Sequence, residues 1–361
     1  MVTKFTRKEL ERIGRTEEEI DLVLKYQKRF PIILDNEDNI EKFCIDARML
    51  YKEIIQSDDM SHFSRWMKRA IKNYGFAEGY NKALEQLEHP YALLLNSDVE
   101  VTEGWLKPLL DYMECHPNTA ACQPKIRAQR HPSAFEHAGA AGGYMDSLGY
   151  PFCRGRIMDV VEEDNGQYDQ VAQVFWATGA ALMVRTDVYQ QMGGLDGRFF
   201  AHMEEIDLCW RMRCRGWKLV CVPQSVVYHV GGATLNKSNP RKTYLNFRNN
   251  LLMIYKNASE KSLKTILRWR TWLDMTAMIQ MLLTGKPKDA AAVWRARRDF
   301  HRMKPDFETC RKDNLRQTVT ADIPEMMKGS VLWQFYVKRH KTFADLTQGN
   351  TSLNISNEHH P

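Results

Sequence analysis

Short apolar runs alternate with longer helical stretches in the middle of the chain. The runs YALLL, AACQPKI, ATGAALMV and LVCVP are bounded by turn residues and are typical of buried strands. Between them lie WLKPLLDYMEC and EIDLCWRMRCRG, which read as helices. This alternation predicts an α/β layer fold with a mainly parallel sheet.

Helical patterns flank this middle region on both sides. Upstream, residues 6–30 are helical in pattern, a short strand PIIL follows, and two more helical stretches lead to residue 72. After Tyr255 the strand patterns stop, and the chain becomes helical and basic before a polar tail. We therefore expect four parts: a helical segment over 1–72, an α/β domain over 73–257, a basic amphipathic helical segment over 258–345 and a disordered tail over 346–361.

Composition places the chain among ordinary soluble proteins. Of its 361 residues, 43% are hydrophobic and 27% are charged, and a net charge of +6 is too small to indicate nucleic-acid binding. The eight cysteines include no CxxC pair, so neither a disulfide framework nor a structural zinc is indicated, and a reducing cytoplasm is favoured. No signal peptide is visible, and the longest apolar run, WLDMTAMIQMLL, is too short to span a bilayer. Any membrane contact is therefore expected to be peripheral.

The first candidate site is LLLNSDVEV, an apolar strand that ends in Asn96 and Asp98. In open α/β sheets ligands bind beyond the carboxyl ends of the strands, so this carboxylate is well placed. A Mg2+ or Mn2+ ion that bridges a diphosphate needs such an oxygen ligand. The alternative is a plain turn, because Asn-Ser-Asp is also good turn chemistry.

The second candidate is FFAHMEEIDLCW, in which Glu204, Glu205 and Asp207 crowd the first turn of a helix. A carboxylate in a partly apolar cleft can act as a general base toward an acceptor hydroxyl. The alternative is that these acids only complement the helix dipole.

The third candidate is VVYHVGGATL, where His229 follows a strand pattern and precedes two glycines. Such a histidine can be a metal ligand or a phosphate contact, and the glycines allow a close approach of the backbone to a ligand. The alternative is a histidine that is hydrogen-bonded for structural reasons.

These motifs occur together and in order. NYGFAEGYNKAL, LLLNSDVEVTEGWL, WATGAALMVRTDVYQQMGGLDGRFFAHMEEIDLCWRMRCRGW and VVYHVGGATLNKSNPRKTYLNFRNNLLMIYKN resemble glycosyltransferase family 2, in particular its rhamnosyltransferase-like and galactofuranosyltransferase-like members, over about residues 73–257. The resemblance implies a GT-A fold and inverting transfer of a sugar from a UDP- or dTDP-sugar to a hydroxyl of a cell-surface glycan or lipid-linked acceptor.

The resemblance also implies roles for single residues. Asp98 stands where the family has the last, metal-binding aspartate of its DxD-type motif, with Asn96 in place of the first acid. Glu205 takes the position of the catalytic base, and His229 that of a histidine that completes the metal site. The acceptor side is represented by Thr178, Gly179 and Arg248.

Upstream of Asn73 the family's first βαβ unit is not recognisable. The closest match is PIILDN, which would place Asp35 near the nucleobase or ribose, but no partner strand precedes it. A weakened donor site is expected from this departure.

The N-terminal part has a different resemblance. FCIDARMLYKEI followed by DMSHFSRWMKRAIKNYGF is similar to the phage AntA/AntB antirepressor domain. The rival function is therefore a non-catalytic phage-type regulatory or interaction protein fused to a transferase remnant, and nucleic acid could be contacted only through this segment.

The basic C-terminal segment carries SLKTILRWRTWLDMTAMIQMLL and PKDAAAVWRARRDFHRMKP. Basic amphipathic helices with aromatic residues can lie in an anionic membrane interface, here the inner face of the plasma membrane. The alternative is that the two helices only pack on the catalytic core.

Overall fold

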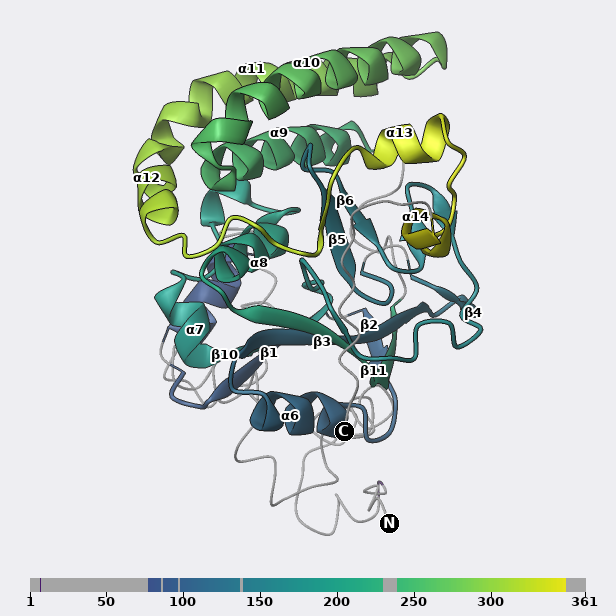
Figure 1. Cartoon of the computed structure of the whole chain (residues 1–361), viewed down its shortest axis with the longest axis vertical. Coiled ribbons are helices and arrows are strands. Elements are labelled where there is room, and N and C mark those ends of the chain that lie inside the picture. The colour runs from purple at the N-terminus through teal and green to yellow at the C-terminus, as the bar shows by residue number, and fades with distance from the viewer. Residues whose placement is uncertain are drawn as a thin grey trace.

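The computed structural model describes residues 7, 77–85, 87–96, 98–136, 139–229 and 239–348. Residues 77–84 are helical and are followed by two sheets and their covering helices (Figure 1). The strands of the larger sheet are β1 (Tyr91–Leu95), β2 (Val99–Val101), β3 (Thr119–Ala128), β4 (His131–Phe135), β9 (Ala172–Gln173), β10 (Ala181–Arg185) and β11 (Lys218–His229). The strands of the smaller sheet are β5 (Gly143–Asp146), β6 (Pro151–Cys153), β7 (Arg156–Ile157), β8 (Val160–Val161) and β12 (Met326–Met327). The α-helices are α6 (Leu106–Cys115), α7 (Thr186–Gln191), α8 (Glu204–Cys214), α9 (Pro240–Asn257), α10 (Glu260–Leu283), α11 (Pro287–Met303), α12 (Glu308–Arg316), α13 (Val331–Tyr336) and α14 (Phe343–Gln348), with 3-10 turns at Gly197–Phe199 and Lys304–Phe307.

The larger sheet is mixed. Its order is β1-β10-β3-β11-β2, with β4 paired to β3 and β9 paired to β11. The pairing of β3 with β11 is parallel, whereas β10 is antiparallel to both β1 and β3, and β2 is antiparallel to β11. The α/β class expected from the sequence is confirmed, but among the described strands the sheet is not mainly parallel. Strand β10 lies between β1 and β3 and runs opposite to both. Helices α7 and α8 therefore connect β10 to β11, which runs in the opposite direction.

Two hydrophobic cores lie on the two faces of this sheet. Successive side chains of a strand point to opposite faces. Met183 of β10 and Cys122 of β3 pack with residues of α6, whereas their neighbours Leu182 and Ala121 belong to the core that contains α8 and α9. Figure 1 shows α6 below the sheet and α8, α9, α10 and α11 above it.

The smaller sheet corrects the expectation that strands stop after Tyr255. Met326 of β12 pairs in parallel with Met145 of β5. At the end of β5, the carboxylate of Asp146 accepts hydrogen bonds from the backbone of Tyr150 and of Val331, at 2.8 and 2.9 Å. A strand of two residues has no periodicity that a sequence could reveal.

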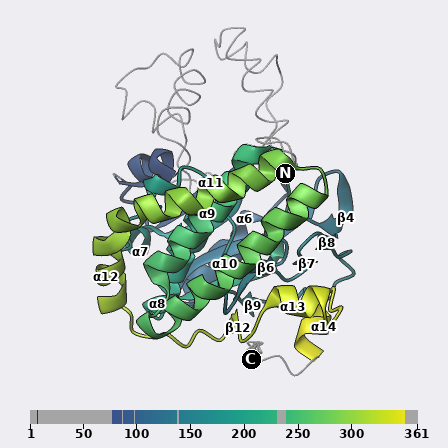
Figure 2. The same ribbon diagram turned by 90° about the horizontal axis from the view of Figure 1, so that it is seen from above.

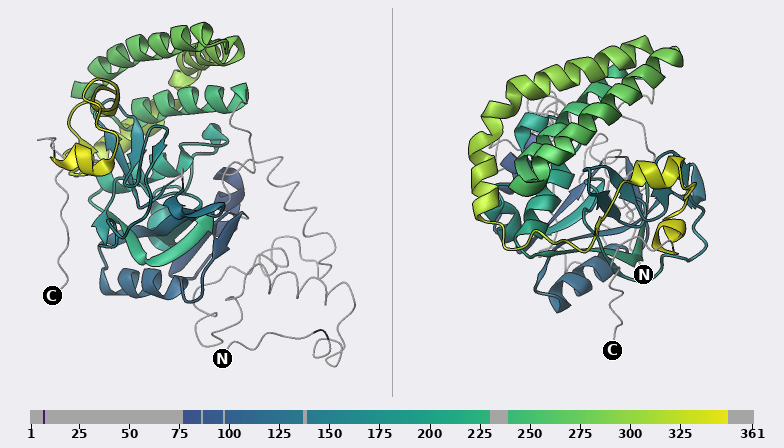
Figure 3. Two further views of the ribbon diagram at one scale, coloured as in Figure 1. Left: turned by 90° about the vertical axis from the view of Figure 1, so that its right-hand side faces the viewer. Right: turned by 45° about the horizontal axis from the view of Figure 1, so that its top comes forward.

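The remaining C-terminal segment is helical, as expected. Helices α10 and α11 form a hairpin that is the outermost layer above α9 (Figures 2 and 3). Helix α14 extends to Gln348, and Leu346 within it is fully buried, so the expected tail does not begin at residue 346. Asp35, the antirepressor-like stretch and the chain beyond 348 lie outside the described residues.

Candidate active site

Two of the residues singled out in the sequence meet at one edge of the larger sheet. Strands β1 and β11 run in the same direction, because β1 is antiparallel to β10, β10 to β3, and β3 is parallel to β11. Their carboxyl ends carry Asp98 and His229. The Oδ1 atom of Asp98 lies 3.2 Å from Nε2 of His229, and both side chains are largely buried. The edge that ligands favour in open α/β sheets therefore carries a carboxylate and an imidazole in contact.

A third residue, Glu136, completes this group and was not anticipated from the sequence. Its Oε2 lies 3.5 Å from Nδ1 of His229, an ion-pair distance. Its backbone N–H donates to the carbonyl of Ile126 at 3.0 Å, which fixes the residue beside the end of β3. The stretch HPSAFE has no clear apolar alternation, so nothing in the pattern distinguishes Glu136 from the many other acids.

The imidazole is held between two acids. Burial would lower the pKa of His229, but the nearby carboxylates of Glu136 and Asp98 outweigh burial and raise it.

The segment that was expected on the acceptor side lies next to the turn after β1. The backbone N–H of Asn96 donates to the carbonyl of Ala180 at 2.9 Å. Thr178 and Gly179 are buried, and the backbone N–H of Thr178 donates to Oε1 of Gln123 at 2.9 Å. The structure thus brings the 178–180 segment together with Asn96, but the Thr178 side chain is packed inward.

The loop before α8 has a strained backbone. Phe200, His202 and Met203 all have positive φ angles, of 67°, 70° and 74°. Non-glycine residues in this region cost about 1–3 kcal/mol each and persist only where the surroundings impose them.

Helix α9 imposes this conformation. The Nδ2 atom of Asn249 donates to the carbonyls of Phe199, Ala201 and His202, at 3.0, 2.8 and 2.8 Å. Arg248 Nη2 also donates to the carbonyl of Phe199, at 3.0 Å. The predicted basic position Arg248 therefore acts, together with Asn249, on the loop that leads into Glu204 and Glu205.

The two glutamates at the start of α8 differ in exposure. Glu204 is 4% exposed, and its Oε2 has no hydrogen-bond partner among the described residues. Burial, followed by the charges of Glu205 and Asp207, raises the pKa of Glu204 well above its usual range. Glu205 is half-buried, and burial raises its pKa against the hydrogen bonds from its own and the Ile206 backbone N–H groups. Glu205 is thus the more accessible of the two.

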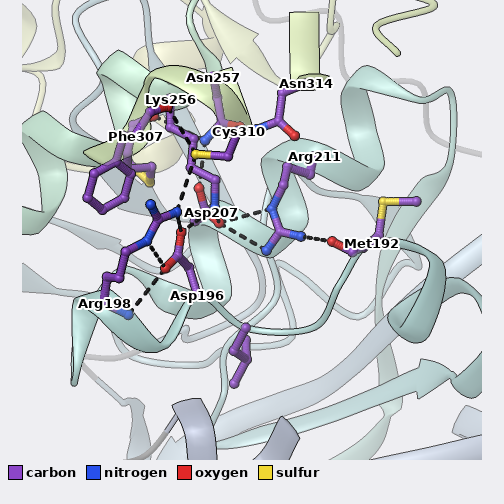
Figure 4. Close-up of polar contacts among 12 residues, drawn as sticks. Met192, Asp196, Arg198, Asp207, Arg211, Lys256, Asn257, Phe307, Cys310 and Asn314 are labelled. Atoms are coloured by element: carbon purple, nitrogen blue, oxygen red, sulfur yellow. Dashed lines mark hydrogen bonds and ion pairs between the residues drawn. The ribbon is translucent and has the colours of Figure 1, made fainter. Parts of the chain in front are cut away.

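Asp207 was expected among the catalytic acids, and the structure corrects this. Its side chain is fully buried, and its Oδ2 accepts from Arg211 Nε at 3.0 Å and from Lys256 Nζ at 2.8 Å. Asn257 Nδ2 donates to its Oδ1 at 2.7 Å. Figure 4 shows these contacts and the neighbouring Asp196, which also pairs with Lys256. A carboxylate enclosed by three partners cannot reach an acceptor hydroxyl, so Asp207 joins α8 to α9.

The Asp98 and His229 pair fits a divalent cation. Two ligand atoms at about 2.1 Å from one octahedral ion lie about 3 Å apart, close to the separation of Asp98 Oδ1 and His229 Nε2. Glu136 stands where an acid would hold the Nδ1–H of a metal-bound histidine. Within the described ranges no group of three or more His, Cys, Asp or Glu side chains could hold an ion. Asp98 and His229 would supply two ligands, and the diphosphate of a bound donor would supply others.

Two further expected site features are not tested by the structure. Asp35 and the two glycines after His229 lie outside the described residues.

Comparison with known proteins identifies a matching family and several relatives. Residues 66–244 match the family model described as glycosyltransferase-like family 2. The N-acetylglucosaminyl-diphospho-decaprenol L-rhamnosyltransferase of Mycobacterium tuberculosis is 28% identical over 171 residues, which are 44% of this chain and 56% of that protein. The low-salt glycan biosynthesis hexosyltransferase Agl10 of Haloferax volcanii is 23% identical over 185 residues, which are 50% of this chain and 57% of that protein. The chain thus spans little more than half the length of these relatives.

Among solved structures, Staphylococcus aureus TarS 1-349 in complex with UDP-GlcNAc aligns over 72% of this chain and 78% of that chain, with 11% identity and a TM-score of 0.40. GalNAc-T7 with UDP, GalNAc and Mn2+ aligns over 55% of this chain and 40% of that chain, with 13% identity and a TM-score of 0.38. The family match covers the turn at Asp98, the acids at the start of α8 and His229. Through residues 66–244 the chain belongs to glycosyltransferase family 2.

Proposed function

We propose that the protein transfers a sugar from a nucleotide-diphosphate donor, UDP- or dTDP-linked, to a hydroxyl of a cell-surface glycan or lipid-linked acceptor, with inversion. The observation that carries this proposal is the contact between Asp98 and His229 at the carboxyl edge of the larger sheet, with Glu136 behind the imidazole. The mycobacterial relative, whose name specifies a diphospho-decaprenol acceptor, supports a lipid-linked acceptor.

Asp98 and His229 would hold a Mg2+ or Mn2+ ion. When bound, such an ion neutralises charge that develops on a leaving diphosphate. Glu136 would keep the Nδ1–H of His229 in place, so that the Nε2 lone pair faces the ion.

Glu205 is proposed as the general base. The acceptor oxygen forms a bond to the anomeric carbon while the bond from that carbon to the diphosphate oxygen breaks. The hydroxyl proton passes to the Glu205 carboxylate. A single displacement of this kind inverts the anomeric carbon without a covalent glycosyl-enzyme.

Other residues have positioning roles in this proposal. Asn249 and Arg248 hold the strained loop that aims Glu205. Burial of Glu204 beside it favours the neutral acid, which limits repulsion between the two neighbours. Thr178 and Gly179 shape the acceptor side through their backbone.

We place the reaction in the cytoplasm, where a lipid-linked acceptor would be reached at the inner face of the plasma membrane. Within the described residues no helix is long and apolar enough to cross a membrane.

Calorimetric titration of the full chain with UDP and with dTDP, each with and without Mn2+, tests the donor site. Metal-dependent binding of either nucleotide supports the proposal. A folded protein that binds neither nucleotide would contradict it and would favour the non-catalytic interaction protein.

A further inference from the structure

The hairpin of α10 and α11 has one face packed on the protein and one face open to solvent. On the inner side, Val293, Ala296 and Phe300 of α11 are buried, and α10 contributes Arg270 and Asp274 to the interior. Figures 2 and 3 show the hairpin along the outside of the molecule, above α9. These helices therefore pack on the core, as the alternative in the sequence analysis expected, but only through one face.

Large apolar side chains gather on the open face. Of the twelve exposed large hydrophobic residues in the described part of the chain, half belong to this hairpin. They are Trp269, Trp272, Ile279, Leu282, Leu283 and Trp294. Trp272 is 70% exposed and Leu283 is 84% exposed, so neither is shielded by neighbours. At helical spacing, Trp269, Trp272, Ile279 and Leu283 fall on one side of α10.

Most charges of the hairpin are sorted between the two faces, although Arg298 and Arg302 also pair with Asp299, at 3.2 and 3.6 Å. Eight of the basic residues between positions 261 and 304 are exposed, namely Lys261, Lys264, Arg268, Lys286, Lys288, Arg295, Arg298 and Arg302.

The acids between the same positions are turned inward. Asp274 pairs with Arg297 Nη1 at 2.6 Å, Asp289 accepts from the Thr243 hydroxyl at 2.6 Å, and Asp299 from the Tyr244 hydroxyl at 2.8 Å. The open face therefore combines tryptophans and leucines with cations, and its exposed acid is Glu260 at the start of α10.

We propose that this face docks on an anionic phospholipid surface. The tryptophans and leucines would enter the boundary between headgroups and acyl chains, and the lysines and arginines would contact the lipid phosphates. A second copy of the chain is a poorer occupant, because it would bring the same cations face to face. This docking does not depend on the transfer reaction, and its test needs no turnover.

The test is cosedimentation of the full chain with vesicles at low and high salt. Vesicles of mixed phosphatidylglycerol and phosphatidylcholine should bind the protein, and pure phosphatidylcholine should bind it at least about tenfold more weakly, because each basic residue near an anionic surface contributes to affinity. High salt should reduce binding to the mixed vesicles.

Two sets of variants assign binding to the hairpin. The triple variant Trp269→Ala, Trp272→Ala, Trp294→Ala should lose most binding. The control Trp333→Ala on α13, where the tryptophan is 57% exposed as Trp269 is, should keep binding. The charge reversal Lys288→Glu with Arg295→Glu should weaken binding at least about tenfold. The matched reversal Lys312→Glu with Arg316→Glu on α12, whose side chains are 74% and 77% exposed, should not.

Three results would overturn the proposal. They are a wild-type protein that does not sediment with the anionic vesicles, control variants that lose as much binding as the hairpin variants, and a dimer in sedimentation velocity that the tryptophan variant dissociates.

Discussion

The Oδ1 atom of Asp98 lies 3.2 Å from Nε2 of His229, although 131 positions separate the two residues in the sequence. Val99 pairs directly with His229 where β2 meets β11, so the turn before β2 delivers Asp98 to the imidazole. Glu136 approaches the same ring from its other nitrogen. The two acids of this arrangement, Asp98 and Glu136, each give a separate prediction.

The first prediction concerns Asp98. The variant Asp98→Asn keeps the size of the side chain but removes the charge that a divalent ion needs, so Mn2+-dependent binding of UDP or dTDP should fall at least about tenfold. Calorimetry with and without Mn2+ measures this. Asp111→Asn on α6, an acid whose side chain is 53% exposed, is the matched control. Unchanged binding in Asp98→Asn would remove this residue from the metal site.

The second prediction concerns Glu136, which contacts the proposed ligand His229 and not the ion. The variant Glu136→Gln should lower Mn2+ affinity about 10–100-fold, the range for partners that orient metal-bound histidines. Titration of Mn2+ followed by electron paramagnetic resonance, with donor nucleotide present, measures affinity without turnover. The exposed Glu103→Gln should bind as the wild type does. An affinity in Glu136→Gln equal to that of the wild type would show that the ring needs no support from this acid.

The sequence predicted the strand and helix that carry Asp98 and Glu204 better than it predicted the residues that contact them. The run YALLL has uniform apolar character and a turn after it, so β1 and the position of Asp98 follow from local chemistry. The helix at Glu204 is likewise visible, because acids cluster at its first turn and apolar residues follow. Glu136 was missed because its role depends on a ring that is 93 positions away, a contact that no local pattern encodes.

Asp207 shows the opposite failure. Its spacing from Glu204 is typical of a first-turn acid, and nothing in EEID distinguishes a base from a structural carboxylate. The difference arises from Lys256 and Asn257 at the far end of α9, which reach it only in the folded chain. The smaller sheet was missed for a similar reason, since its strands are two to four residues long.

The third prediction concerns Glu205 and pH. The variant Glu205→Gln should reduce kcat by at least about 100-fold, the usual contribution of a general base, while nucleotide binding is kept. Because burial raises the pKa of this carboxyl, the wild-type rate should fall on acidification at a higher pH than an ordinary glutamate would give. The pH profile of kcat checks this. A profile without an acid limb above the ordinary glutamate range would exclude Glu205 as the base.

The fourth prediction concerns acid stability. Burial would raise the pKa of Asp196, but the hydrogen bond from Arg198 and the charge of Lys256 outweigh it and lower the pKa. A carboxyl with a lowered folded-state pKa stabilises the fold above its unfolded pKa of about 3.9, and this stabilisation is lost as the pH falls below that value. Urea unfolding at several acidic pH values should show a shallower loss of stability in Asp196→Asn than in the wild type. Parallel losses in the two proteins would count against the role of this group.

The last prediction separates structure from catalysis at Asp207. The variant Asp207→Ala leaves Arg211 and Lys256 without their shared buried carboxylate, which should lower the free energy of unfolding by about 3–5 kcal/mol. The control Asp313→Ala breaks an exposed pair with Arg316, and should change stability by less than about 1 kcal/mol. Urea unfolding at neutral pH compares the two, and kcat per folded molecule should be retained within about tenfold in Asp207→Ala, because this carboxylate touches no substrate. A variant that unfolds like the wild type but has lost turnover would return Asp207 to the catalytic group.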